Sequence, residues 1–301
     1  LLQQMGSSGR NYRREVRSGF KKIISEIYSP PRVTGELLRR GRKHLLPGFA
    51  LDITCNDPSD NTPWDFSLQS KRERARKLLR IQKPYLLIGS PECRAFSTWQ
   101  ALNEAKSNDV PALRRARIQA TVHIDFVAEL YHEQIQSGRY FLHEHPIGAS
   151  SWSLPSMQQL RAIDGVQVAH ADQCQYGAEI QSGQYRGQPI KKPTGFMTNS
   201  PALYKTLSQR CQGIAGNCSR PEGGKHQACS GVHAKRAAVY PRDLCRAILK
   251  GANEQLKLDG KLIPGCYGIQ AVDEEDPIAV TRGPEQGFTG KYHDDLTGQV
   301  L

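Results

Sequence analysis

Long hydrophobic runs are absent from this sequence. No stretch approaches 18 consecutive apolar residues, which is about the length that a helix needs to cross a bilayer. A membrane-spanning helix is therefore excluded, and no membrane partner is expected. Internal repeats and low-complexity tracts are also missing. The length of 301 residues, of which 38% are hydrophobic, is typical of a globular chain with one large or two smaller domains.

Cysteine is too sparse for a secreted disulfide scaffold. The sequence has eight cysteines among 301 residues, and they are not evenly distributed. A reducing compartment, nuclear or cytoplasmic, is the expectation that follows. In such a compartment, cysteines serve metal binding or catalysis more often than cross-linking.

Acidic residues are scarce near the start. Residues 10–43 contain eleven Lys or Arg against three Glu, a local charge of +8 within a chain of net charge +12. This field favours a polyanionic partner, most simply nucleic acid, although a solvated basic surface would give the same composition. After Val272 the sign reverses, and an acidic segment rich in Gly and Pro indicates a linker.

Apolar runs and helical patterns alternate along the rest of the chain. The runs predict strands at 22–28, 49–54, 85–88, 139–146, 166–174 and 195–199. Helices are predicted at 67–82, 111–137, 155–163, 201–210 and 241–258. This order predicts an α/β fold whose mostly parallel sheet is flanked by helices. We divide the chain into a basic arm (1–22), an α/β domain (23–200), a Cys/His-rich subdomain with a closing helix (201–262) and an acidic linker (263–301).

Three of these helices have a predicted buried side. In 111–137 it is a stripe spaced by four residues, formed by Ile118, Val122, Phe126 and Leu130. In 67–82, which Ser67 would open, it comprises Ala75, Leu78, Leu79 and Ile81. In 241–258 it comprises Leu244, Ile248 and Leu249.

Reactive side chains lie in or just after three of the predicted strands. Cys93 follows 85–88, Glu144 lies near the end of 139–146, and Asp52 lies within 49–54. In open α/β sheets, ligands bind outside the carboxyl ends of the strands. A cysteine and a glutamate on neighbouring strand ends suit a nucleophile with an acid partner, while an inert buried thiol is the structural alternative.

The loop around Cys93 resembles a known sequence motif. The stretch GSPECRAFS, 89–97, is similar to the Pro-Cys loop of cytosine-C5 DNA methyltransferases, and FLHEHP, 141–146, resembles their Glu-Asn-Val strand end. The stretch SEIYSP, 25–30, falls where that family has its glycine-rich cofactor loop. The matching residues of the Pro-Cys loop are Gly89, Pro91, Cys93, Phe96 and Ser97.

The resemblance implies a fold, a reaction and a set of site residues. The fold would be that of the class I S-adenosylmethionine-dependent methyltransferases. The Cys93 thiolate would add to C6 of a cytosine in DNA, with Glu144 at the N3 edge and Arg94 lowering the thiol pKa. The base would have to leave the stack. The implied cofactor contacts are Glu26, Tyr28, Ser29, Asp52, Asp65, Ser90 and Pro91.

Two departures from the family pattern define an alternative. The turn after 22–28 has no glycine before Gly35 and contains Pro30 and Pro31, and His145 stands where the family has Asn. The alternative is a catalytically inactive nucleic-acid-binding module. A thiol hydrolase that uses Cys93 with His143 is a third reading.

The end of the chain carries a second resemblance. The stretch YHDDLTGQVL, 292–301, is similar to the linker that precedes the reverse transcriptase in Copia-type retrotransposon polyproteins. Together with the first residue, Leu1, it leads us to expect a polyprotein segment with an adjoining reverse transcriptase.

A cluster of metal-binding residue types lies at 211–231. Cys211, Cys218, His226 and Cys229 form a Cys3His set that suits structural zinc, with His233 as a reserve ligand. Their spacing is not that of a standard zinc finger, so unrelated thiols in a metal-free loop are the alternative.

Overall fold

The computed structural model describes residues 21–40, 44–98, 100, 109–229 and 237–262. All of them belong to one unit, Leu1–Ile263. Most of the basic arm, the acidic linker with its retrotransposon-like end, and His233 lie outside the described residues. Within the described part, no helix is both long and apolar enough to span a bilayer.

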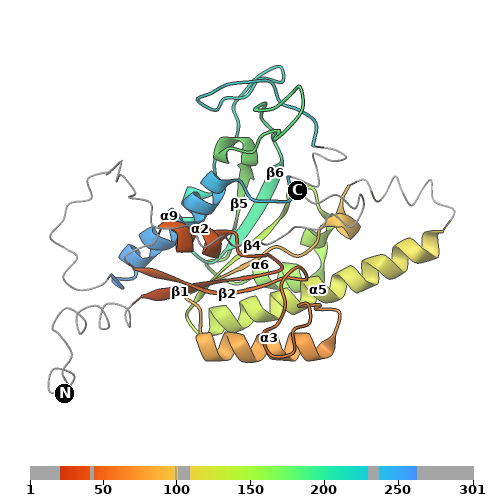
Figure 1. Cartoon of the computed structure of the whole chain (residues 1–301), viewed down its shortest axis with the longest axis vertical. Helices are drawn as coiled ribbons and strands as arrows, with labels where there is room; N and C mark the ends of the chain where they lie inside the picture. Colours follow the sequence, from red (N-terminus) through yellow and green to blue (C-terminus); the bar gives the residue numbers. More distant parts are fainter. Residues whose placement is uncertain (1–20, 41–43, 99, 101–108, 230–236, 263–301) are drawn as a thin grey trace, which may run out of the picture. The chain divides into compact units, whose positions relative to one another are not determined.

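A six-stranded sheet forms the centre, in the order β2-β1-β3-β4-β6-β5 (Figure 1). Its strands are β1 Lys22–Ile27, β2 Leu45–Leu51, β3 Leu86–Gly89, β4 Tyr140–Pro146, β5 Gln167–Asp172 and β6 Pro193–Thr198. β2, β1, β3 and β4 are parallel, and β6 pairs antiparallel with both β4 and β5. The prediction of an α/β fold with a mostly parallel sheet is confirmed.

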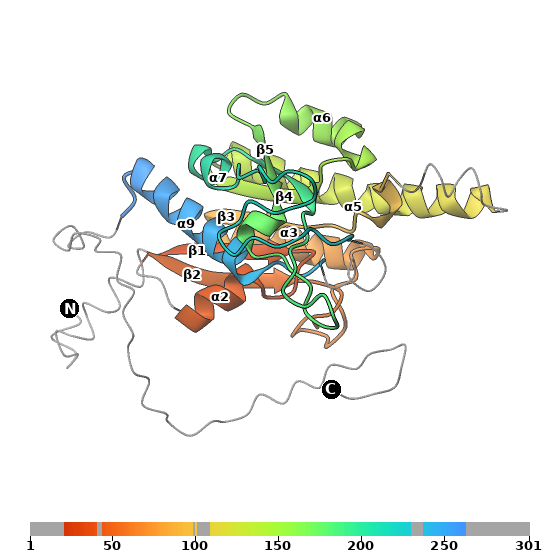
Figure 2. The ribbon, with the colours of Figure 1, turned by 90° about the horizontal axis from the view of Figure 1, so that it is seen from above.

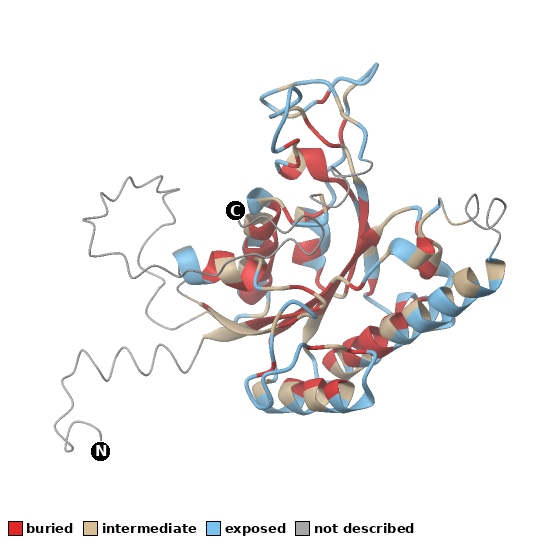
Figure 3. Ribbon diagram, turned by 45° about the vertical axis from the view of Figure 1, so that its right-hand side comes forward, coloured by how far each residue is buried: buried red, intermediate tan, exposed pale blue. Residues whose placement is uncertain are grey.

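Helices cover both faces of the sheet (Figure 2). They are α2 Val33–Arg40, α3 Gln69–Gln82, α5 Val110–Gln136, α6 Pro155–Arg161, α7 Pro201–Thr206 and α9 Arg242–Leu258. Short 3-10 turns are η1 Arg94–Phe96, η2 Ser150–Ser153 and η3 Gln173–Tyr176. Since side chains alternate along a strand, Leu86 and Ile88 of β3 pack with α2, α7 and α9, and Leu87 packs with α3, α5 and α6. The inner strands β3, β4 and β6 are almost continuously buried between these layers, whereas most of the edge strand β2 is half-buried (Figure 3).

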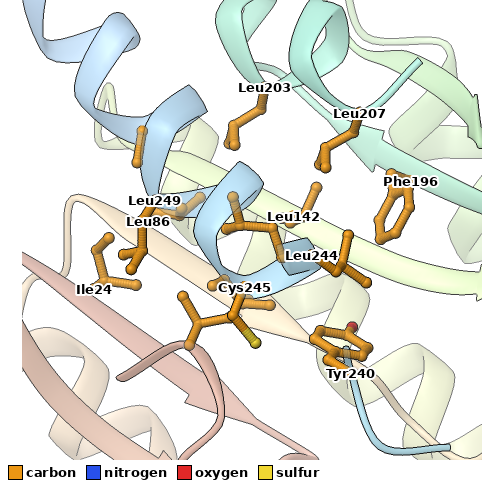
Figure 4. Packing of buried hydrophobic residues seen from close by; sticks show 14 of the residues in the cluster. Ile24, Leu86, Leu142, Phe196, Leu203, Leu207, Tyr240, Leu244, Cys245 and Leu249 are labelled. Carbon is orange, nitrogen blue, oxygen red and sulfur yellow. The ribbon is translucent and has the colours of Figure 1, made fainter. Parts of the chain in front are cut away.

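α9 closes one face of the sheet as its apolar pattern predicts. Leu244, Ile248 and Leu249 are fully or almost fully buried, and they pack against β-strand residues such as Leu86 and Leu142 (Figure 4). The helix that ends the predicted Cys/His-rich region therefore belongs to the core of the sheet.

The predicted stripe of α5 is wrong over its first half. Phe126 and Leu130 are buried, but Ile118 is 67% exposed and Val122 41% exposed. Four residues turn a helix by about 400°, so a stripe spaced by four drifts by about 40° at each step. Over the three steps from Leu130 back to Ile118, that drift carries the side chain away from the sheet.

The start and one inner residue of α3 were also misplaced. The helix begins at Gln69 after Leu68, and no side chain caps it, so Ser67 does not open it. Ile81 is 66% exposed, whereas Ala75 and Leu79 are buried as predicted.

β2 begins four residues before the predicted strand, and Pro47 and Gly48 lie inside it. A proline is tolerated there since β2 is an edge strand. Gly48 permits close approach of the neighbouring strand: a Cβ at this position would lie 2.2 Å from Ser25 Oγ. Both residue types usually end a strand, which is why the sequence pattern misplaced it.

Shortening Ile248 to Ala should test the contribution of α9 to the core. We expect Ile248→Ala to lower the free energy of unfolding by about 2–5 kcal/mol, because it leaves a cavity between α9 and the sheet. Leu258→Ala, on the same helix but 69% exposed, should change it by less than about 0.5 kcal/mol. Urea denaturation followed by circular dichroism measures both. Equal effects of the two changes would contradict the packing of α9.

Candidate functional site

The strand order creates a switch point between β1 and β3. From β1 the chain passes to β2 on one side, and β3 joins β1 on the other side. At such a point the loops after the strands diverge and leave a crevice at the carboxyl ends. A cavity of about 880 Å3 lies there, and its walls include Tyr28, Asp52, Asp65 and Ser90. Four of the seven predicted cofactor contacts thus share one cavity.

Aromatic rings form one wall of this cavity. The rings of Tyr28 and Phe66 have centroids 4.8 Å apart, and Trp64 packs against Phe66. The Tyr28 hydroxyl forms a hydrogen bond of 3.0 Å with Nδ1 of His123 on α5. Burial raises the Tyr28 pKa and lowers the His123 pKa, so both groups are neutral at pH 7. Tyr28 has φ 56°, in the left-handed region that glycine normally occupies.

The other predicted cofactor contacts after β1 serve the turn itself. The buried Glu26 carboxylate accepts hydrogen bonds from the amides of Arg32, Val33 and Thr34, at 2.8–3.1 Å. It also accepts from the hydroxyls of Ser29 and Thr34. Burial raises the Glu26 pKa, and these hydrogen bonds lower it in part. Glu26 and Ser29 therefore fix the start of α2 and are not in the cavity wall.

Cys93 and Glu144 belong to neighbouring parallel strands. β3 pairs with β4 in a register that sets Gly89 beside His143. Glu144 is the next residue of β4, and Cys93 lies four residues beyond Gly89. The negative charge of Glu144 acts on the Cys93 thiol. Both groups consequently lie at the carboxyl edge of the sheet.

Glu144 has a cationic partner that the sequence pattern did not identify. Lys192 Nζ lies 3.6 Å from Glu144 Oε1, and Gln173 Nε2 lies 3.5 Å from the same oxygen. Lys192 immediately precedes β6. Its neighbourhood, 184–193, was visibly basic, but only the antiparallel pairing of β6 with β4 brings it to Glu144.

The Cys93 thiol is protonated at neutral pH. Burial and the charge of Glu144 raise the Cys93 pKa, and the charge of Lys192 lowers it in part. Arg94, which was expected to lower this pKa, begins η1 and lines the cavity. The cation that favours the thiolate is thus Lys192.

His145 fixes the loop that carries Cys93. Its Nε2 lies 3.1 Å from the Pro91 carbonyl oxygen, and its Nδ1 lies 2.6 Å from Ser151 Oγ. With the hydroxyl of Ser151 donating to Nδ1, Nε2–H donates to the carbonyl. Pro91 is buried in this contact, and it is not in the cavity wall.

His143 lies on the other face of β4. It is fully buried and its Nδ1 is 3.2 Å from the Tyr131 hydroxyl of α5. Side chains alternate along a strand, so His143 faces away from Glu144. Burial lowers the His143 pKa well below its usual value. This placement gives no geometric support to a Cys93–His143 hydrolase.

A second group of side chains could hold a metal ion such as zinc. Cys174, Cys211, Cys218 and His226 have ligand atoms that all lie within 4.8 Å of one another. Cys211 Sγ is 3.9 Å from Cys218 Sγ and 3.6 Å from His226 Nε2. A tetrahedral zinc with Zn–S bonds of about 2.3 Å separates its ligand atoms by about 3.5–3.8 Å. The spacing therefore fits a Cys3His site.

The composition of this group corrects one predicted ligand. Cys211, Cys218 and His226 are brought together as expected, but the fourth member is Cys174 in η3, directly after β5. Cys229 is exposed and outside the group. Cys174 was missed because it lies far from the cluster in sequence, within a predicted strand.

Hydrogen bonds prepare the metal group and join it to Glu144. Burial raises the Cys211 pKa, but donors from Ser219 and Gly213 outweigh it and lower this pKa to about 6. The Asp172 carboxylate accepts from the Cys211 amide at 2.9 Å. Gln173, next to Cys174, contacts Glu144 through its side-chain amide, and its backbone N–H donates to the Lys192 carbonyl.

Comparison with known proteins adds no relative. No protein-family model matches the sequence, and no curated protein matches it. A functional assignment therefore depends on the residues and on their geometry.

The rate of Cys93 alkylation should report the two charges beside it. Glu144→Gln removes a negative charge, so the Cys93 pKa should fall and iodoacetamide should react severalfold faster at pH 8. Lys192→Met should raise the pKa and slow the reaction. Mass spectrometry of the Cys93 peptide separates it from the other thiols, and Lys191→Met is the control. Equal rates in all three variants would contradict the arrangement.

Zinc content should distinguish Cys174 from Cys229. Protein purified without chelators should hold about one equivalent of zinc, and Cys174→Ser should reduce this to less than about a tenth. Cys229→Ser should retain it. Elemental analysis is the measurement. Zinc lost with Cys229→Ser and kept with Cys174→Ser would restore the ligand set predicted from the sequence.

Proposed function

We propose that the chain is a cytosine-C5 DNA methyltransferase-like protein that holds a target base between Cys93 and Glu144. The observation that carries this proposal is the group at the carboxyl edge: a thiol on the loop after β3, and a carboxylate on β4 paired with Lys192. The resemblance of residues 89–97 to the Pro-Cys loop supports it. A base could reach this group only after leaving the nucleic-acid stack.

The chemistry of these residues is a nucleophilic addition. The Cys93 thiol gives its proton to the Glu144 carboxylate, and the sulfur forms a bond to C6 of the cytosine. The electron pair of the C5–C6 double bond moves through C5 and C4 toward N3. Glu144 then donates that proton to N3 and so neutralises the charge that develops there, while Lys192 keeps the carboxylate oriented.

S-adenosylmethionine would supply the methyl group that C5 takes. The nucleoside half of this cofactor fits the residues present: the cavity is large enough, Asp52 follows β2, and Phe66 and Trp64 offer ring faces. The amino-acid half is less well served. The turn after β1 has no glycine, and Glu26 already occupies the amides at the start of α2.

A nucleic-acid-binding module without methyl transfer is the second candidate. The same turn favours it, because Pro30 and Pro31 donate no N–H and Tyr28 stands in the cavity wall where a glycine would be expected. The raised Cys93 pKa also favours it. A place beside a reverse transcriptase in a Copia-type polyprotein suits either candidate, and the resemblance of residues 292–301 supports it.

An oligonucleotide that contains 5-azacytosine should trap the addition. Its ring nitrogen at position 5 takes a proton once C6 is bonded to sulfur, so the adduct needs no methyl donor. We expect a covalent complex on a denaturing gel with the unaltered chain and with Cys229→Ser, and none with Cys93→Ser. Glu144→Gln should slow the trapping about 100-fold, as loss of a positioned acid does.

Calorimetric titration with S-adenosylmethionine should separate the two candidates. Binding that Asp52→Ala weakens, together with the adduct, supports the methyltransferase. An adduct without cofactor binding supports the binding module. Absence of both would contradict a reaction at Cys93.

A further inference from the structure

α5 is divided by charge along its length. From Val110 to Ile124 the helix has no acidic residue, and it carries Arg114, Arg115 and Arg117. The acidic residues, Asp125 among them, are all in the second half.

Two acidic residues of the second half form ion pairs with α3. Glu129 forms two hydrogen bonds of 2.6 and 2.7 Å with Arg76 of α3, and Glu133 pairs with Arg80 one turn further. Those carboxylates therefore serve the contact between the two helices. Among the described residues, Arg114 and Arg115 have no such ion-pair partner.

The basic half extends beyond the carboxyl edge of the sheet. α5 connects two parallel strands, β3 and β4, so it runs antiparallel to them and begins at the edge where they end. Its buried residues start only at Ile124, and the preceding turns project from the body (Figure 2). Arg114 and Arg115 are exposed on this projection.

This projection is attached to the candidate site. Leu113, Ala120 and His123 line the cavity. The guanidinium of Arg117 lies 5.8 Å from the centre of the Phe96 ring, in the loop that carries Cys93, and donates to Ser150 Oγ at 3.2 Å. Arg114 and Arg115 lie on the turn of α5 between Leu113, which lines the cavity, and Arg117, which contacts the loop that carries Cys93.

We propose that Arg114 and Arg115 bind backbone phosphates of the DNA strand that carries the target base. This inference rests on the proposed function, and it names the surface that takes the strand. Charge complementarity selects the occupant, because two exposed guanidinium groups without an ion-pair partner in the described part of the chain, on a segment without acidic residues, attract phosphates. Arg117 positions the Cys93 loop against the same helix.

The salt dependence of binding tests the proposal on the full chain. Fluorescence anisotropy would measure the affinity for a labelled duplex and a labelled single strand over a range of salt concentrations. We expect Arg114→Ala with Arg115→Ala to reduce the slope of log K against log salt by about 1.8 on duplex and about 1.4 on single-stranded DNA. Arg114→Lys with Arg115→Lys should keep the slope, because the charges remain.

Lys77→Ala with Lys250→Ala is the matched control. It removes two exposed charges from α3 and α9, so a slope unchanged in this variant excludes an effect of net charge alone. An unchanged slope in the double arginine variant would overturn the assignment of this surface. If that variant instead alters self-association without DNA, the surface belongs to a second copy of the chain.

The outcomes separate this inference from the proposed function. An unaltered chain that binds no DNA at any salt concentration would overturn both. Binding with the usual salt slope, together with trapping at Cys93 but no effect of the arginine variant, would overturn this inference alone. If the double arginine variant loses slope on DNA as expected, but the unaltered chain binds RNA of the same sequence more tightly than DNA, the bound strand would be reassigned to RNA.

Discussion

The carboxylate of Glu26 is the group on which the arrangement around the switch point depends. It is fully buried, and a buried carboxylate without partners would be costly enough to prevent folding. The chain meets this cost by folding the residues after β1 back over it, so that three successive amides and two hydroxyls donate to its oxygens. This turn sets where α2 begins, and it leaves Tyr28 in a left-handed conformation at the cavity wall.

On the opposite side of the cavity, a hydrogen bond from β4 fixes the neighbouring loop in a similar way. His145 reaches from the strand to the Pro91 carbonyl, so the loop with Cys93 is tied to the strand that carries Glu144. Ser90, on the same loop, is hydrogen-bonded to the Tyr240 hydroxyl just before α9. The thiol, the carboxylate and the cavity therefore keep their relation through hydrogen bonds between neighbouring elements, and not through loop contacts alone.

Much of the fold could be predicted from the sequence, because buried parallel strands leave short continuous apolar runs such as that of β3. The limits of this prediction from sequence have physical causes. The insertion of β6 between β4 and β5 is decided by long-range pairing, which leaves no local signal, and it brings Lys192 to Glu144. Cys174 joins the metal group through the same pairing. The exposure of Ile118 depends on the drift of the four-residue spacing around α5 and also on where α5 leaves the sheet, for which the helix carries no local signal.

The metal group also bears on how the chain assembles. In the sequence, the ligands flank β6 and α7: Cys174 precedes these two elements, and the other three ligands follow them. An ion bound there would close the intervening chain into a loop, and closing a loop lowers the conformational entropy of the segment within it. That segment contains the strand that must enter between β4 and β5. Metal binding would thus stabilise the folded arrangement that brings Cys174 to the other three ligands, and in that arrangement β6 lies between β4 and β5.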